Sequence, residues 1–185
     1  MAQKQATQRD PLTNVYNRSA FEREVIRYME QDGSNGMLIM MDIDDFKIIN
    51  DKYGHLQGDE ALKKLTRALQ STFRSHDLIG RLGGDEFMVF VKGTISRELL
   101  NQRLDHMVLL LNENSDRKIT CSVGVSIAKS KNFVYEDTLN QADIALYQSK
   151  KKGKNQHSYY EKTEAIKASV LTFPGWRHEP ELPPE

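Results

Sequence analysis

The chain has 185 residues, and a hydrophobic content of 38% is enough for one domain with its own core. The 26 basic and 26 acidic residues cancel, which argues against a general nucleic-acid or membrane surface. The single cysteine, Cys121, excludes an internal disulfide, and no apolar run approaches the length of a membrane span. We therefore expect a cytoplasmic domain with no nucleic-acid partner and no membrane segment.

Composition divides the chain into three parts. Residues 1–8 are polar and are expected to form a flexible N-terminal segment. Residues 9–160 carry the apolar periodicity of a folded domain. Residues 161–185 turn charged and then rich in proline, so we expect a C-terminal tail there.

Apolar periodicity predicts alternating helices and strands. Helices are expected over residues 17–31, 44–53, 57–73, 97–111 and 138–151. Strands are expected over residues 37–43, 119–127 and 156–160, in addition to a hairpin over 79–91. The first of these strands is an unbroken apolar run, as in a central strand covered on both faces. This order predicts an α/β (α+β) sandwich with a mixed sheet.

The hairpin has a Gly-Gly step at its tip. Gly83 and Gly84 separate the two apolar runs, and such a turn is expected to need φ > 0 and to lack room for a Cβ. Asp85 and Glu86 follow directly, so a phosphate or a metal ion could approach the backbone closely. Taken alone, this stretch also fits an ordinary solvated hairpin tip, with acids for solubility.

Three acids lie at the end of the first long strand. Asp42, Asp44 and Asp45 would repel one another unless a cation were bound, and oxygen ligands favour a hard ion such as Mg²⁺. The alternative is that acids here cap the helix that follows and complement its dipole. We assign the capping role to Asp44 or Asp45 and leave Asp42 for the metal.

The short helix after these acids is expected to bury Phe46, Ile49 and Tyr53. That arrangement turns Lys47 and Asn50 together to the other side. A lysine beside carboxylates suggests phosphate, and an asparagine suggests the edge of a base. A solvated helix face explains either residue by itself.

Two further features are compatible with a nucleotide. Asp59 begins the long helix, where it either complements the dipole or accepts hydrogen bonds from guanine N1–H and N2–H₂. Lysines at a helix end favour the C-terminal carbonyls, but four in five positions is more than capping requires. These lysines are Lys150, Lys151, Lys152 and Lys154.

Residues 83–87 read G-G-D-E-F and resemble the signature of the GGDEF family of diguanylate cyclases. The resemblance extends from about Arg9 to Tyr160, in motif order and spacing. The other stretches that carry it are Asp10–Thr13 with Asn17 and Arg18, Asp42–Lys47, Asn50–Asp51, Gly54–His55, Gly58–Glu60, Ala142–Tyr147, Lys150 and Gly153–Asn155. The implied fold resembles the nucleotidyl cyclase and polymerase palm, with a mixed, mostly antiparallel central sheet, helices around it and the hairpin at the active site.

The resemblance implies condensation of two GTP molecules to cyclic di-GMP with release of two pyrophosphates. By position, Asp42, the backbone carbonyl of Ile43 and Asp85 resemble the ligands of Mg²⁺, with Mn²⁺ as the alternative ion. Glu86 resembles a further member of the metal shell. Asp85 also resembles the general base at the 3′-hydroxyl, and Lys47 resembles the cation that stabilises the transition state.

The remaining substrate residues are also implied only by the resemblance. They are Lys150 and Lys154 for phosphate, Asn50, His55 and Asp59 for the nucleotide, and Gly83 and Gly84 at the signature turn. Two positions depart from the commonest pattern. Aspartate is the third signature residue, and lysine stands at 154, where arginine is frequent and would grip phosphate with a bidentate fork.

Arg74 and Asp77 resemble the family's inhibitory R-x-x-D site for the product, cyclic di-GMP. Their alternative interpretation is an exposed i,i+3 ion pair at a helix end. Because one domain holds one GTP, the reaction needs a transient homodimer. A catalytically silent receptor for GTP or cyclic di-GMP is the alternative function, although such receptors often lose an acid that this chain keeps.

Overall fold

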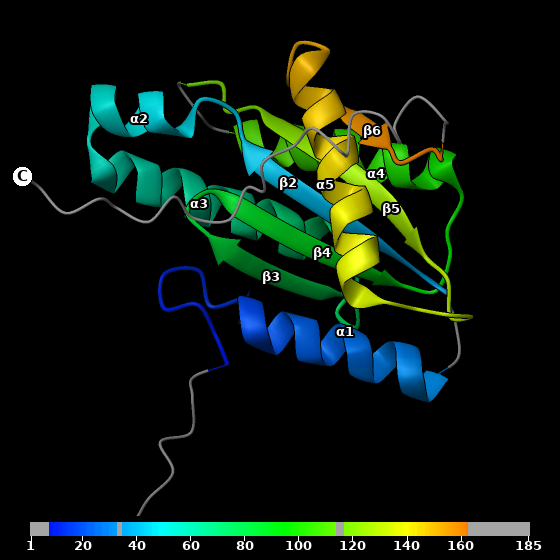
Figure 1. Cartoon of the computed structure of the whole chain (residues 1–185). Helices are drawn as coiled ribbons and strands as arrows, with labels where there is room; N and C mark the ends of the chain where they lie inside the picture. Colours follow the sequence, from blue (N-terminus) through cyan, green and yellow to red (C-terminus); the bar gives the residue numbers. More distant parts are fainter. Residues whose placement is uncertain (1–7, 33–34, 114–116, 163–185) are drawn as a thin grey trace, which may run out of the picture.

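The computed structural model describes residues 8–32, 35–113 and 117–162, and Figure 1 shows the arrangement. The predicted segment over 1–8 and tail over 161–185 lie almost wholly outside the described residues. The described strands are β1 (Tyr16–Asn17), β2 (Gly36–Ile43), β3 (Leu78–Gly83), β4 (Glu86–Lys92), β5 (Cys121–Ala128) and β6 (His157–Tyr159). The described helices are α1 (Arg18–Asp32), α2 (Phe46–Tyr53), α3 (His55–Thr72), α4 (Arg97–Asn112) and α5 (Tyr135–Lys151).

The strands form one sheet in the order β1-β3-β4-β2-β5-β6. The β2–β4, β2–β5 and β3–β4 pairs are antiparallel, whereas β1–β3 and β5–β6 are parallel. The prediction of a mixed, mostly antiparallel sheet is therefore confirmed. β2 lies inside the sheet and every one of its residues is buried, as its unbroken apolar run predicted. β1 was not predicted because a strand of 2 residues is too short to show a period.

Alternate residues of β2 pack into two separate hydrophobic cores, because successive side chains of a strand point to opposite faces of the sheet. Met37, Ile39 and Met41 pack with residues of α3 and α4. Leu38 and Met40 pack with residues of α1 and α5. Figure 1 shows the same division, with α1 and α5 on one face of the sheet and α3 and α4 on the other.

α5 lies with its backbone directly on β5. A Cβ at Gly124 would come within 2.2 Å of the Ala142 carbonyl oxygen and of the Leu146 nitrogen, so only glycine allows this approach. Near the end of the helix, the Ser149 hydroxyl donates to the Val123 carbonyl at 2.6 Å. This close packing of α5 on β5 fixes the position of the last turn of α5, which carries Lys150 and Lys151.

The short helix differs from its prediction. α2 begins at Phe46, and Phe46 and Ile49 are half-buried against the core. Tyr53 was expected on the buried face, but it is 38% exposed and lies under the Arg117 guanidinium, 3.7 Å from its ring centroid. α3 begins at His55, directly after α2, and no residue of α2 is fully buried. Among the described helices, none has the length and apolar content needed to cross a membrane.

Candidate active site

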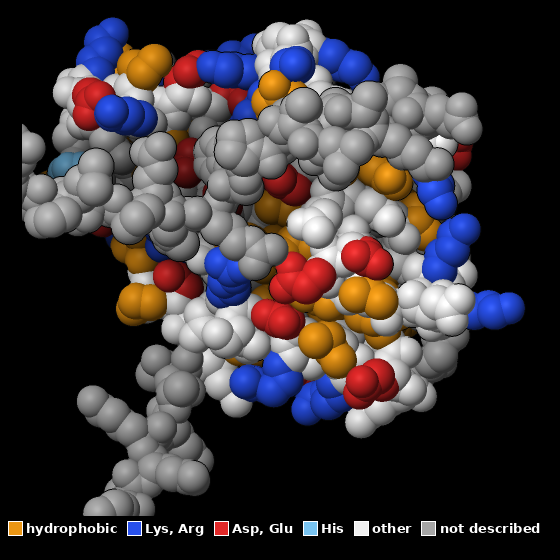
Figure 2. Space-filling model, in the orientation of Figure 1, with side chains coloured by type: hydrophobic (Ala, Val, Ile, Leu, Met, Phe, Trp, Pro, Cys, Tyr) orange, Lys and Arg blue, Asp and Glu red, His pale blue; other side chains and the backbone are white. Residues whose placement is uncertain are grey.

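The acidic end of β2 and the signature turn meet across the sheet. Asp42 is paired in register with Glu86 of β4 on one side and with Ser122 of β5 on the other. Residues directly opposite in an antiparallel pair point to the same face, with Cβ atoms about 4.5–5.5 Å apart. Asp42 and Glu86 therefore extend the α1/α5 face of the sheet, and the turn residue Asp85 lies next to them. Figure 2 shows acidic side chains gathered near the middle of this face, beside basic and apolar ones.

Asp42 is an almost buried acid, with 7% of its surface exposed. Burial raises its pKa to about 6; the Lys150 hydrogen bond opposes the rise, while the charge of Asp85 and a hydrogen bond with it add to it. The Lys150 ammonium donates to Asp42 Oδ2 at 2.7 Å. One cation at this distance does not fully offset the burial and the neighbouring acid, so the cluster has a deficit of positive charge.

Two more carboxyls share this environment. Burial raises the pKa of Glu86, and the negative charges of Asp42 and Asp143 add to the rise, against the positive charges of Lys150 and Arg18. Burial also raises the pKa of Asp143 on α5, with Lys150 opposing it. Sequence reasoning gave Asp143 no role, although its place in the Ala142–Tyr147 motif was a signal. Raised acid pKa values at one site are typical of a position that receives a cation or a proton.

The acids after β2 do not cap α2 in the predicted way. Asp45 precedes the helix with φ at 57°, and its side chain makes no capping hydrogen bond. Asp44 is buried, and its carboxylate accepts from the Thr120 hydroxyl at 2.7 Å, the Ser122 hydroxyl at 2.6 Å and the Asn155 backbone N–H at 2.9 Å. Asp44 therefore joins the end of β2 to β5 and to the loop after α5.

The loop after α5 returns a second lysine to the acids. Lys154 and Asn155 both have positive φ, at 63° and 47°. This conformation places the Lys154 ammonium 2.6 Å from Asp45 Oδ1, and that hydrogen bond raises the lysine's pKa. Of the four lysines in the cluster, Lys150 and Lys154 reach the acids, whereas Lys151 lies over the Tyr147 ring at 4.7 Å from its centroid.

The tip of the hairpin has the predicted backbone but not the predicted crowding. Gly83 and Gly84 have φ of 152° and 52°, as the turn requires. A Cβ at either glycine would meet no atom of the described chain within 4 Å, so the expected lack of room is wrong. Glycine serves here for its backbone conformation, and it leaves the surface over Asp85 open to an approaching group.

The predicted nucleotide residues lie on α2 and α3, the two helices that follow the acids at the end of β2. Lys47 and His55 are exposed, Asn50 and Asp59 are half-buried, and within the described ranges no hydrogen bond joins these four to the carboxylates. Gly58 makes room for one of them: a Cβ there would come within 2.0 Å of the Asn50 Oδ1.

The predicted inhibitory residues are arranged differently from an exposed ion pair. The side chain of Asp77 is fully buried, and its two oxygens accept from the backbone N–H groups of Arg74 and Lys92, at 3.0 and 3.1 Å. Arg74 itself is exposed. Asp77 thus holds the bend before β3, and only Arg74 presents its side chain to solvent.

The donors near the signature turn suit a hard cation. Within residues 8–32, 35–113 and 117–162, no three His, Cys, Asp or Glu side chains form a ready-made metal cluster. Mg²⁺ does not require one, because it is commonly held by one or two carboxylates together with water and substrate phosphate. Asp42 and Asp85 share a site that raises the pKa of Asp42, and a divalent ion would relieve this repulsion. The donor set therefore fits the ion.

Comparison with protein families matches residues 7–156 to the family described as "Diguanylate cyclase, GGDEF domain". Among curated relatives, "Probable diguanylate cyclase DgcC" of Escherichia coli K12 is 39% identical over 155 residues, which are 80% of this chain and 42% of the relative. "Cyclic di-GMP phosphodiesterase NbdA" of Pseudomonas aeruginosa is 32% identical and is matched over 90% of this chain and 22% of its own length. The chain therefore spans less than half of each of these relatives.

Solved structures show the same likeness. The diguanylate cyclase SiaD of Pseudomonas aeruginosa, solved with its activator SiaC, superposes with a TM-score of 0.75 at 32% identity, covering 84% of this chain and 63% of that one. The GGDEF domain of DgcB from Caulobacter crescentus, solved in complex with c-di-GMP, gives a TM-score of 0.74 at 28% identity, covering 88% and 97%.

Proposed function

Since the chain belongs to the GGDEF domain family of diguanylate cyclases, as its motifs predicted, we propose that it condenses two GTP molecules to cyclic di-GMP and two pyrophosphates. The observation that carries the proposal is the convergence of Asp42, Glu86 and Lys150 beside the open turn that bears Asp85. This arrangement places acids, a cation and accessible backbone at one point. Phosphoryl transfer between nucleotides needs these groups together.

Asp85 is proposed to accept the proton of the 3′-hydroxyl as that oxygen attacks the α-phosphate of the other GTP. Asp42, the Ile43 carbonyl, Asp85 and Glu86 would hold the divalent ion, Mg²⁺ or Mn²⁺. The ion would supply positive charge to the phosphoryl oxygens and the leaving pyrophosphate. Asp42 is well placed for this role because its carboxylate is held near the end of β2 by Lys150.

The cations and polar groups around the turn would bind the substrate. Lys150 and Lys154 already lie beside the acids and would exchange carboxylate for phosphate when GTP binds. The open backbone at Gly83 and Gly84 would let the phosphates approach closely. The remaining roles follow the family's motifs: Lys47 for transition-state charge, and Asn50, His55 and Asp59 for the nucleotide.

The reaction joins two nucleotides, so two copies of the domain would have to face each other. The rate should therefore rise with the second power of the protein concentration while dimerisation is weak. Dilution of the protein through the micromolar range, with initial rates measured at saturating GTP, tests this proposal. A specific activity that does not change on dilution contradicts a transient homodimer.

The direct test is to incubate the protein with GTP and Mg²⁺ and to measure pyrophosphate and cyclic di-GMP, with ATP as the substrate control. Asp85→Asn should abolish product formation without lowering the melting temperature, because the residue lies in a turn and not in the core. Asp137→Asn is a matched control, since that exposed acid lies in the first turn of α5, at the opposite end from Lys150. Equal rates for parent and Asp85→Asn would overturn the proposal. GTP binding without product would favour the receptor function instead.

We also propose inhibition by the product at Arg74, with Asp77 as the residue that shapes the bend. The exposed guanidinium of Arg74 can fork onto guanine O6 and N7, whereas the buried Asp77 carboxylate holds the backbone N–H of Arg74 itself. Added cyclic di-GMP should slow the parent non-competitively and leave Arg74→Ala unaffected. If both proteins are slowed alike, or if excess GTP restores the parent, Arg74 has no such role.

A further inference from the structure

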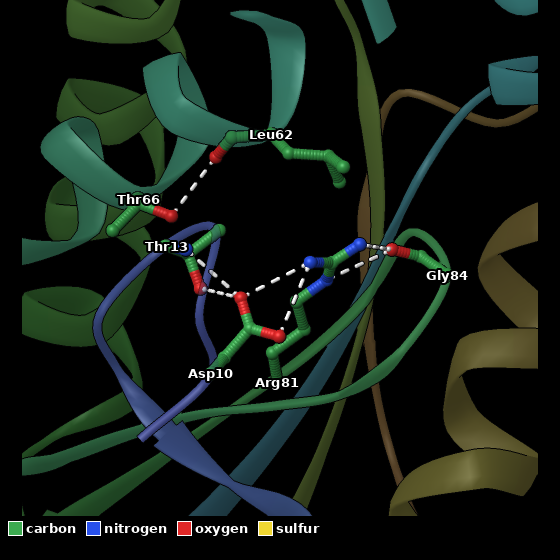
Figure 3. Close-up of polar contacts among 6 residues, drawn as sticks. All are labelled: Asp10, Thr13, Leu62, Thr66, Arg81 and Gly84. Atoms are coloured by element: carbon green, nitrogen blue, oxygen red, sulfur yellow. Dashed lines mark hydrogen bonds and ion pairs between the residues drawn. The ribbon is translucent and has the colours of Figure 1, made fainter. Parts of the chain in front are cut away.

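The side chain of Arg81 joins the signature turn to Asp10, which lies 71 residues before Arg81 in the chain (Figure 3). The Arg81 guanidinium lies between two acceptors. Its Nη1 donates to Asp10 Oδ1 and Oδ2 at 3.1 and 3.3 Å, and its Nε and Nη2 donate to the Gly84 carbonyl oxygen at 3.0 and 2.6 Å. One planar group thus holds a carboxylate and the backbone of the turn at the same time.

The hairpin does not fix this turn by itself. The β3–β4 pairing slips between Arg81 and Gly83 and resumes only with the Gly83–Glu86 pair, so the ladder is irregular next to the tip. The two glycines have no side chains to pack, and the space around them is open. Beyond the Gly83–Glu86 pair, the Arg81 side chain adds two hydrogen bonds to the Gly84 carbonyl and so restrains the turn itself.

The orientation of the Gly84 carbonyl influences where the backbone places Asp85, the first residue of the Asp85–Glu86 pair. The Gly84 oxygen and the Asp85 nitrogen belong to one planar peptide unit. Two hydrogen bonds on the oxygen therefore restrict the rotation of the plane from which the Asp85 Cα leaves. Displacing a reacting group by about 1 Å can cost about a hundredfold in rate.

The other end of the tether is rigid. Asp10 Oδ1 also accepts from the Thr13 backbone N–H at 2.9 Å and from the Thr13 hydroxyl at 2.6 Å. The Asp10 backbone is held in addition by Val15 and Asn14, each at 2.8 Å. Burial alone would raise the pKa of Asp10, but the hydrogen bonds from Thr13 and Arg81 outweigh it and lower the pKa. Asp10 is thus a fixed, ionised anchor.

The tether is also sheltered from water. The side chains of Arg81 and Asp10 are 12% and 17% exposed, compared with 49% and 65% for Arg97 and Glu161, which form an ordinary surface pair at 3.0 Å. Solvent screens sheltered charges less than exposed ones, so the first pair can hold a geometry that the second cannot.

We infer that Asp10 and Arg81 are positioning residues that set the place of Asp85 and Glu86 in the catalytic site through the Gly84 carbonyl. Neither residue is assigned contact with substrate, and the inference rests on the proposed function for its kinetic consequence. Its structural consequence, a tip held by Arg81, is independent of any activity.

Arg81→Lys is the central variant, because one ammonium cannot reach both the Asp10 carboxylate and the Gly84 carbonyl in the geometry of a guanidinium fork. Asp10→Asn removes the charge at the other end and keeps the shape. Both should lower kcat by about tenfold or more, with the affinity for the unreactive 3′-deoxy-GTP changed less than about threefold. The double variant should be no slower than the slower single variant, because both changes break one tether.

Arg97→Ala is the matched control, since it breaks an ion pair of similar length at the start of α4, which follows the end of β4 opposite to the turn. Its kcat should equal that of the parent. Hydrogen exchange of the backbone amides over residues 82–87 gives the readout without activity: these amides should exchange at least about tenfold faster in Arg81→Lys and at the parent rate in Arg97→Ala.

Unchanged exchange over residues 82–87 in Arg81→Lys would overturn the inference, whatever the activity. A loss of kcat that only follows a loss of folded protein, or that Arg97→Ala shares, would also overturn it. If the parent makes no cyclic di-GMP, the proposed function fails; the exchange experiment then still decides whether Arg81 holds the turn.

Discussion

Replacing Asp42 with asparagine should stabilise the ligand-free protein while abolishing turnover. In the folded protein, burial raises the pKa of Asp42 to about 6 from an ordinary 3.8, and Asp85 adds to the rise. At neutral pH, the ionised Asp42 carboxylate therefore lowers the free energy of unfolding. The asparagine side chain would remove that charge but would still offer an oxygen to the Lys150 ammonium. The substitution would also remove a proposed ligand of the divalent ion.

The magnitude follows from the difference in pKa between the folded and unfolded states. A rise of about 2 units corresponds to at most about 3 kcal/mol, at about 1.4 kcal/mol per unit. Because Lys150 is partly exposed and the asparagine must keep its hydrogen bond, we expect a gain of about 1–2 kcal/mol at pH 7.

The sign sets the pH window. The folded state binds the Asp42 proton more tightly than the unfolded chain does. The contribution of this proton to the free energy of unfolding is therefore fully present below about pH 4. It is lost as the pH rises to about 6, where the folded carboxyl ionises. The advantage of Asp42→Asn over the parent should therefore be absent at pH 4, grow between pH 4 and 6, and stay constant above that range.

Urea unfolding of both proteins in EDTA, at pH 4, 5, 6 and 7, measures this difference. A variant that is less stable than the parent at pH 7, or whose advantage is the same at every pH, would refute the reasoning. Adding Mg²⁺ with 3′-deoxy-GTP should stabilise the parent and leave the variant unchanged. Substantial cyclic di-GMP formation by the variant would show that Asp42 is not required for catalysis.

Three further substitutions test the packing around the site. Gly58→Ala places a methyl group 2.0 Å from the present position of the Asn50 Oδ1, so it should weaken binding of 3′-deoxy-GTP by about fivefold, equivalent to one hydrogen bond, without lowering the melting temperature by more than a few degrees. An unchanged dissociation constant would show that Asn50 does not contact the nucleotide. Ser122→Ala deletes a buried donor to the Asp44 carboxylate and should cost about 1–3 kcal/mol in urea unfolding, whereas a neutral result would mean that Asp44 is satisfied without it. Gly124→Ala should cost about 3 kcal/mol or more, because the methyl group meets helix backbone at 2.2 Å that cannot rotate away; a loss below about 1 kcal/mol would show that α5 can move off the strand.

Local pattern was sufficient for most elements of the fold. The unbroken apolar run of β2, the Gly-Gly step at 83–84 and the helix over about 57–73 were predicted in place, because each depends on the local pattern of a strand, a turn or a helix. The acids at the end of β2 and at the turn were also identified from sequence. Their pairing across the sheet follows from the register that the apolar pattern imposes.

The roles of individual polar residues depended on contacts between distant segments. The sequence suggested that Asp77 is an exposed partner of Arg74. In the structure its carboxylate is buried and accepts a hydrogen bond from the backbone N–H of Lys92 on β4. Asp44 looked like a helix cap, but β5 and the residue before it supply two hydroxyls to it. Both positions fit a local motif in the sequence, and both were reassigned by donors that lie 15 to 78 residues away along the chain.

Sequence by itself determined the family, the approximate order of the elements and the candidate acids of the site, since these depend on residue type and short-range spacing. Only the tertiary structure decided which lysines reach the acids and that Arg81 joins Asp10 to the turn. A hydrogen bond depends on positions and angles at the scale of an ångström. Those are set by how the sheet and helices pack, which local periodicity does not specify.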